Sequence, residues 1–247
     1  MTYPSDRKGE QMTWSIVARD ESTGLLAIAV STCAFAVGAR VPFVETGVGA
    51  IATQSFVNPF YGYRGLELLR NGMPAADVIG HLTEPDEGRA QRQVHLVDRA
   101  GRFAAYTGAE CVPWCGYLLR DGFSVAGNML AGRQVIEETA RVFESAKGQP
   151  MPSRLLAALR AGEAAGGDKR GKQSAAILIH DSEEYPLLDI RVDDHQDPLT
   201  ELARLEEVSR SRFLHYRKFM PSRANPWGIL DRAEIERRIA ESMAEEK

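Results

Sequence analysis

The chain has 247 residues, of which 44% are hydrophobic and 26% are charged, and its formal net charge is -4. This composition is typical of a soluble globular protein with one large domain, or with one domain and an extension. The small acidic excess gives no sign of a nucleic-acid partner. No apolar run approaches the roughly 20 residues of a membrane-spanning helix, so we expect no membrane contact.

The compartment is indicated by the first residues and by the cysteines. The beginning of the chain lacks the apolar core of a secretory signal. Three cysteines (Cys33, Cys111 and Cys115) are an odd number in a long chain, which suits a reducing compartment better than a disulfide framework. We therefore expect a cytoplasmic protein.

The first elements are a polar leader and two hairpins. Residues 1–11 are polar and aperiodic, and we expect this leader to be absent or removed in the mature protein. Residues 14–19 and 25–30 are predicted strands joined by a tight polar turn that ends in Gly24. Residues 41–45 and 48–53 form the next predicted pair.

Amphipathic helices and further strands follow along the chain. Helices are predicted at residues 61–71, from Pro74 to residue 82, at 135–143 and at 152–162, and strands at 93–98, 103–107, 123–127, 174–180 and 187–192. From Asp197 onward the chain is helical and strongly charged, with a break at residues 225–228 and a capping-box spacing at residues 231–234.

These elements indicate an α+β fold with four layers. The second and fourth strands are continuous apolar runs, which is typical of strands covered on both faces. Two mainly antiparallel sheets packed face to face, with helices outside each sheet, meet that condition. We predict that residues 12–195 form this αββα domain and that residues 196–247 form a helical extension, which makes a homodimer plausible.

Thr13 is the first candidate for chemistry, because it begins the first strand directly after Met12. If Thr13 became the first residue, its hydroxyl would be a nucleophile and its own α-amine, with a pKa of roughly 7.7–8.0, would be the base. The alternative interpretation is an ordinary β-branched strand residue.

Polar side chains also gather where predicted strands end, which is a common place for binding groups. They are Gln54, Ser55, Asn58 and Tyr61 after the fourth strand, Asn128 after Gly127, and Asp168 and Arg170 in a glycine-rich loop. An Asn at such a position can aim its amide at a developing oxyanion. The alternative for each group is ordinary turn chemistry or a solvated loop.

Other motifs give little support to metal or hydrolase chemistry. Cys111 and Cys115 have no second ligand pair at finger spacing, and Asp193, Asp194 and His195 are more typical of a strand end leading to a helix cap. No serine lies in a Gly-x-Ser-x-Gly elbow. We expect no metal and no organic cofactor.

Five ordered segments closely resemble the Domain of Unknown Function 1028 family, which is placed in the N-terminal nucleophile (Ntn) hydrolase superfamily. They are TWSIVARD (13–20), GVGAIATQS (47–55), NPFYG (58–62), GNML (127–130) and AGGDKRGKQSA (165–175). The resemblance covers about residues 12–195. It implies a four-layer αββα fold and cleavage of an amide bond by an N-terminal Thr, Ser or Cys. The leader in front of Thr13 departs from the family pattern.

The function predicted from the residues and the resemblance is an amidohydrolase that acts on a small or peptide-like substrate. Thr13 is the nucleophile, Ser15 relays a proton or replaces it, Asp20 and Asp168 orient the amine, and Asn128 donates to the oxyanion. Arg170 holds a substrate carboxylate, and Gln54, Ser55, Asn58 and Tyr61 line the pocket. The alternatives are a binding protein that kept the fold without the chemistry, or hydrolysis through Ser55 or Cys33 in an unprocessed chain.

Overall fold

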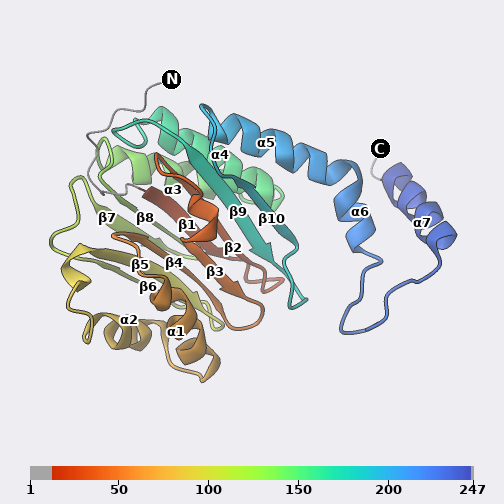
Figure 1. Ribbon diagram of the computed structural model, residues 1–247, viewed down its shortest axis with the longest axis horizontal. Helices are drawn as coiled ribbons and strands as arrows, with labels where there is room; N and C mark the ends of the chain where they lie inside the picture. The colour runs from red at the N-terminus through yellow and green to blue at the C-terminus, as the bar shows by residue number, and fades with distance from the viewer. Residues whose placement is uncertain (1–12, 246–247) are drawn as a thin grey trace.

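A computed structural model describes residues 13–245 of the chain (Figure 1). The leader predicted at residues 1–11 lies outside the described residues. Two antiparallel sheets lie face to face and helices cover their outer faces, so the predicted α+β fold with two antiparallel sheets is confirmed. Within residues 13–245, none of the helices is long and apolar enough to cross a membrane.

The larger sheet has six strands in the order β10-β9-β2-β1-β8-β7, and every neighbouring pair is antiparallel. Its strands are β1 (Thr13–Arg19), β2 (Leu26–Thr32), β7 (Gly116–Arg120), β8 (Phe123–Asn128), β9 (Ser174–His180) and β10 (Leu188–Val192). The sequence pattern predicted all of them except β7, whose residues are half-buried or exposed and whose apolar run is only three residues long.

The smaller sheet has four strands in the order β3-β4-β5-β6, again antiparallel. Its strands are β3 (Pro42–Glu45), β4 (Gly49–Ser55), β5 (Arg92–Asp98) and β6 (Phe103–Thr107). Two single-turn 3-10 helices, η1 (Val37–Ala39) and η2 (Arg89–Gln91), precede β3 and β5.

Helices cover the outer face of each sheet, as Figure 1 shows. The helices α3 (Gln134–Ser145) and α4 (Met151–Ala164) pack on the larger sheet, and α1 (Pro59–Arg70) and α2 (Ala75–Thr83) pack on the smaller one. Apolar side chains at helical spacing bury one face of each helix. In α3, for example, Val135, Ile136 and Phe143 join the core outside the larger sheet.

The alternation along β1 decides which residues face which layer. Trp14 and Ile16 belong to the apolar cluster between the larger sheet and its helices, whereas Val17 belongs to the cluster between the two sheets. Because side chains alternate along a strand, Thr13 and Ser15 lie on the same face as Val17. The start of β1 therefore places two hydroxyls in the layer between the sheets.

The predicted helical extension contains α5 (Pro198–Val208), a π-helical segment η3 (Ser209–Phe213), α6 (Leu214–Arg217) and α7 (Arg232–Glu245). Asp197 caps α5, with its side chain accepting a hydrogen bond from the backbone N–H of Thr200. Leu199 and Leu202 bury α5 against the main body, while α7 packs on α6 and η3 (Figure 1). The sequence predicted these helices but not the π-helical segment.

Candidate active site

Thr13 lies at the head of β1 with only 2% of its surface exposed. It faces Asn128 across the β1–β8 pair, and its hydroxyl donates a hydrogen bond of 3.3 Å to the hydroxyl of Thr32 at the end of β2. Three neighbouring strands thus bring a hydroxyl or an amide to one point, because their ends coincide in the register of the larger sheet.

The backbone carbonyl of Thr13 is held by two amide side chains from different sheets. Gln54 Nε2, from β4, and Asn128 Nδ2, from β8, each donate to this oxygen over 3.4 Å. The same two amides donate to Gln93 Oε1 over 2.8 Å and 3.0 Å. Gln93, on β5, therefore ties both amides together directly beneath Thr13.

A second chain of hydrogen bonds runs through Ser15. Its hydroxyl donates to Gln54 Oε1 over 2.6 Å and lies 2.8 Å from His95 Nε2. Since Ser15 has one proton to give, His95 Nε2 is the donor toward Ser15, and His95 Nδ1 accepts from the hydroxyl of Ser124 at 2.8 Å. Burial lowers the pKa of His95 to about 3, so its imidazole is neutral near pH 7.

A glycine-rich loop brings Asp168 to the same end of the sandwich. The Asp168 carboxylate is buried and accepts from the backbone N–H of Cys33 and of Arg170, both at 2.8 Å. Its second link to Arg170 is an ion pair of 3.3 Å. Cys33 follows Thr32, and Asp168 pairs with Leu130 in an isolated bridge two residues after Asn128. Asp168 and Arg170 therefore border the hydroxyl pair of Thr13 and Thr32.

The comparisons with known proteins agree on the family. The sequence profile described as "Family of unknown function (DUF1028)" matches residues 13–202. The chain belongs to the DUF1028 family. A crystal structure of a DUF1028 protein from Silicibacter pomeroyi is 32% identical, with a TM-score of 0.82, and the alignment covers 89% of this chain and 96% of that one.

A second solved structure is much less similar. Anbu (ancestral beta-subunit) from Yersinia bercovieri aligns over 81% of this DUF1028 chain and 96% of its own, at 13% identity and a TM-score of 0.36, which is too low to carry an argument. No protein of curated function matches the sequence significantly.

Two of the predicted pocket residues lie on the other side of the smaller sheet. Asn58 caps α1 by accepting from the backbone N–H of Phe60 at 3.1 Å, and the Tyr61 hydroxyl donates to Asp86 at 2.8 Å. Burial raises the pKa of Tyr61. Burial also opposes ionisation of Asp86, but hydrogen bonds from Tyr61 and Arg92 outweigh it and lower the Asp86 pKa to about 2. This cluster fixes α1 to its neighbours and does not join Thr13.

Asp20 and Ser55 also lie apart from the hydroxyl pair. Asp20 follows the far end of β1, and seven strand residues span about 20 Å. Its carboxylate accepts from Ser22 and Thr23 within its own turn, and the Ser22 hydroxyl is the main cause of its lowered pKa. Asp20 is therefore too distant to orient an amine at Thr13, which corrects that expectation. Ser55 ends β4 with a φ of +66° and its side chain interacts with Cys111.

The motifs set aside as metal candidates have structural partners. Cys111 and Cys115 are free thiols whose pKa values are raised by burial. His195 Nδ1 accepts from the backbone N–H of Asp197 at 3.0 Å, which fits the predicted helix cap. Among the described residues, no group of three or more His, Cys, Asp or Glu side chains could hold a metal ion.

Five further residues of the buried network were not among those predicted from the sequence, namely Thr32, Gln93, His95, Thr107 and Ser124. A signal for two of them was present in β5, where Gln93 and His95 alternate with Val94 and Leu96. Such alternation ordinarily predicts a solvent-facing side. In a sandwich whose sheets are covered on both faces, it predicts a polar patch between the sheets instead.

Proposed function

We propose that this DUF1028 protein is an Ntn-type amidohydrolase that cleaves an amide bond in a small or peptide-like substrate once Thr13 is the first residue. The observation that supports the proposal is the position of Thr13. It heads an inner strand of a two-sheet sandwich, with its side chain in the layer between the sheets and its carbonyl held by Gln54 and Asn128. The DUF1028 match also begins at this residue.

The proposed reaction uses one residue for two roles. The α-amine of Thr13 accepts the hydroxyl proton while Oγ1 attacks the substrate carbonyl carbon, which gives a tetrahedral intermediate. Collapse of the intermediate breaks the C–N bond, and the ammonium group returns the proton to the leaving amine. Water then hydrolyses the resulting ester and restores Thr13. No metal or organic cofactor takes part in this scheme.

The surrounding residues have proposed roles that follow their contacts. Thr32 lies 3.3 Å from the nucleophile and positions its hydroxyl. Asn128 uses its amide protons on Gln93 and on the Thr13 carbonyl, so its oxyanion role requires release of the longer, 3.4 Å contact to Thr13. Ser15 is fully buried and bonded to Gln54, which favours a positioning role over replacement of Thr13.

Asp168 and Arg170 form the other side of the proposed site. Asp168 is paired with Arg170 and also binds the backbone after Thr32, so it is proposed to position both the amine and the loop. Arg170 remains the proposed contact for a substrate carboxylate, which would share its guanidinium with Asp168. The helical extension is proposed to contact a second copy of the chain, and a monomeric mass in solution by light scattering would contradict that part.

The experiment has two steps. Intact-mass analysis and N-terminal sequencing of protein from its native host should show a chain that starts at Thr13. A panel of small amides and dipeptides is then tested with the processed wild type, Thr13→Ala and Thr13→Ser. We expect Thr13→Ala to reduce kcat/KM at least about 1000-fold, because it removes the nucleophile, and Thr13→Ser to keep part of the activity.

The second candidate is a small-molecule binding protein on the same fold. The closed hydrogen-bond network favours it, since Thr13 is 2% exposed and its carbonyl and hydroxyl both have partners. A native chain that retains residues before Thr13 would leave its nitrogen as an amide without basicity. Equal turnover by wild type and Thr13→Ala would also contradict the nucleophile role and move the search to Ser55 or Cys33.

A further inference from the structure

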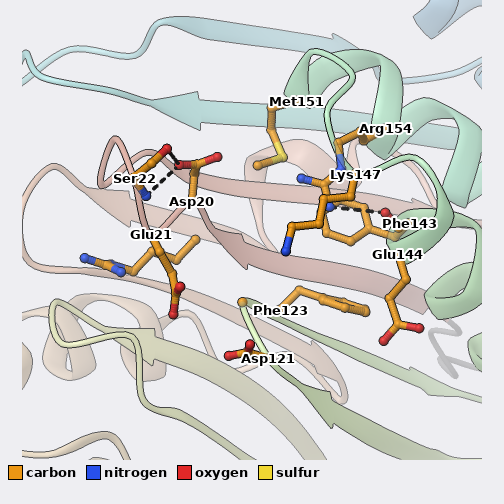
Figure 2. A pocket seen from close by; sticks show the side chains of 12 residues that line it. Asp20, Glu21, Ser22, Asp121, Phe123, Phe143, Glu144, Lys147, Met151 and Arg154 are labelled. Carbon is orange, nitrogen blue, oxygen red and sulfur yellow. Dashed lines mark hydrogen bonds between the residues drawn. The ribbon is translucent and has the colours of Figure 1, made fainter.

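A separate cavity of about 430 Å³ lies at the opposite end of β1 from Thr13 (Figure 2). Three segments enclose it. They are the turn between β1 and β2, the turn between β7 and β8, and the junction of α3 with α4. Its volume falls within the range of ~300–1,000 Å³ that is usual for small-molecule sites. None of the residues in the proposed active site lines it.

The floor of the cavity is aromatic. The rings of Phe123 and Phe143 lie with centroids 4.8 Å apart at an angle of 50°, and both residues are buried. Met151 adds a half-buried thioether at the edge. A floor of this kind contacts an apolar or aromatic group of a ligand without demanding hydrogen bonds.

One side of the cavity carries two basic side chains, together with Glu144, which forms an ion pair of 3.6 Å with Arg120. The Arg154 guanidinium lies 4.1 Å from the centroid of the Phe143 ring and donates to the Phe143 carbonyl at 3.1 Å, while its buried Nε has no hydrogen-bond partner in the part of the chain that the structure describes. Lys147 is exposed and, within residues 13–245, forms no ion pair. Figure 2 shows the side chains of Lys147 and Arg154 entering from the same side. An ammonium and a guanidinium placed together are suited to a carboxylate.

The other side carries two carboxylates, and Arg19 at the end of β1 also lines the cavity. Glu21 and Asp121 are exposed, come from two different turns, and form no ion pair among the described residues. Figure 2 shows them across the floor from Lys147 and Arg154. The nearby Asp20 differs, because Ser22 and Thr23 occupy one of its carboxylate oxygens. Glu21 and Asp121 therefore remain available for a cationic group.

We propose that this cavity binds a small zwitterion with an apolar side chain, of the class of a free amino acid or a short peptide. The ligand carboxylate contacts Lys147 and Arg154, its ammonium group contacts Glu21 and Asp121, and its side chain lies on Phe123 and Phe143. A zwitterion uses both the cationic and the anionic side chains of the cavity, whereas a simple anion would use only the cationic ones. The proposal is independent of the chemistry at Thr13.

The test uses three related probes and the full chain carrying Thr13→Ala, so that no probe is consumed. The probes are the dipeptide Ala-Phe, its N-acetyl derivative without the ammonium charge, and its C-terminal amide without the carboxylate. Binding is followed by calorimetry. We expect Ala-Phe to bind and each blocked derivative to bind at least about tenfold more weakly, because each loses a charge-assisted contact.

Matched variants locate the binding. Lys147→Gln and Asp121→Asn should each weaken Ala-Phe binding about tenfold or more, whereas Arg160→Gln should leave it unchanged, because Arg160 is an exposed base on α4 outside this cavity. Thermal unfolding of each variant confirms that it folds. Absence of Ala-Phe binding, equal binding of the blocked derivatives, or weakening by Arg160→Gln equal to that by Lys147→Gln would overturn the proposal.

Discussion

The layer between the two sheets has two halves that are built differently from the same strands. Away from Thr13 the layer is apolar, with Val17 from β1, Ile28 from β2 and Val97 from β5 in one cluster. Toward Thr13 the same strands change character, and β1 and β5 contribute Ser15 and His95. The two halves are equally buried, yet one is held by packing and the other by hydrogen bonds between side chains.

The hydrogen-bonded half and the apolar half of this layer have different roles. Burying a polar group costs free energy unless it is hydrogen-bonded, so the network gains little stability over an apolar packing of the same volume. Directional bonds do, however, fix atoms in place. In this network Gln93 joins Gln54 and Asn128, and these two hold the carbonyl of Thr13. The polar half therefore positions Thr13, and the apolar half supplies stability.

The largest effect is expected in the apolar half. Ile28 is fully buried between the sheets, and Ile28→Ala should lower the free energy of unfolding by about 3–4 kcal/mol, since it loses apolar contacts and leaves a cavity. Ile28→Val should cost only about 1 kcal/mol. Urea unfolding measures both. A loss below about 1 kcal/mol for Ile28→Ala would show that this half is loosely packed.

A smaller loss is expected when the polar half loses its central amide. Gln93→Met keeps the length of the side chain but removes its bonds to Gln54, Asn128 and the Gly127 carbonyl. We expect a loss of about 2–3 kcal/mol, because buried partners remain without hydrogen bonds. Gln91→Met is the matched control, since Gln91 is exposed and its side chain, among the described residues, bonds to Glu110 alone. A stable Gln93→Met protein would mean that the network contributes nothing to folding.

The fold was predictable from the sequence because it follows from apolar patterns. Strands that are apolar on both faces, such as β2, require cover on both sides, and a connection of only six residues between β1 and β2 excludes a helical crossover. The strand β7 was missed because its side chains are half-buried or exposed and carry no such pattern. The spacing of apolar residues reflects which side chains are buried, so it predicts the helices and strands that pack in the core.

The site was predictable only in part because its contacts are distant in the sequence. Thr13, Gln54 and Asn128 were recognised as polar residues at strand ends, and all three meet. The expectation for Asp20 failed because the strand carries it away from Thr13. His95 was overlooked because nothing local distinguishes a buried polar face from a solvent-facing one. Which polar residues meet is decided by the pairing of the two sheets.

The third prediction concerns the pH dependence of the free energy of unfolding. His95 is neutral in the fold with a pKa of about 3, whereas in the unfolded chain it titrates near 6.5. Its contribution is therefore fully present above pH ~6.5 and is lost as the pH falls, by about 1.4 kcal/mol per pH unit. Urea unfolding between pH 7 and 4.5 measures the slope, in a range above the ionisation of Asp86, whose pKa is about 2.

A matched pair of variants shows which histidine causes this pH dependence. His95→Gln should flatten the pH dependence. His180→Gln is the comparison, since burial also lowers the pKa of His180, which lies in the larger sheet away from the network and contacts Thr46. Because His180 contributes a slope of its own, part of the pH dependence remains in His95→Gln. A slope equal to that of the wild type would mean that His95 is not the buried neutral group, and the hydrogen bond between His95 Nδ1 and Ser124 would then run from the imidazole to the hydroxyl.

The smallest effect should come from the far end of the hydrogen-bond chain. Ser124→Ala removes the hydroxyl that donates to His95 Nδ1 and should cost about 1 kcal/mol, while Ser145→Ala, on the exposed surface of α3, should change stability by less than about 0.5 kcal/mol. Combining Ser124→Ala with His95→Gln should cost less than the sum of the two, because each removes the same bond. Strict additivity would show that the imidazole does not depend on Ser124, and the polar half would then act as separate pairs without a continuous chain.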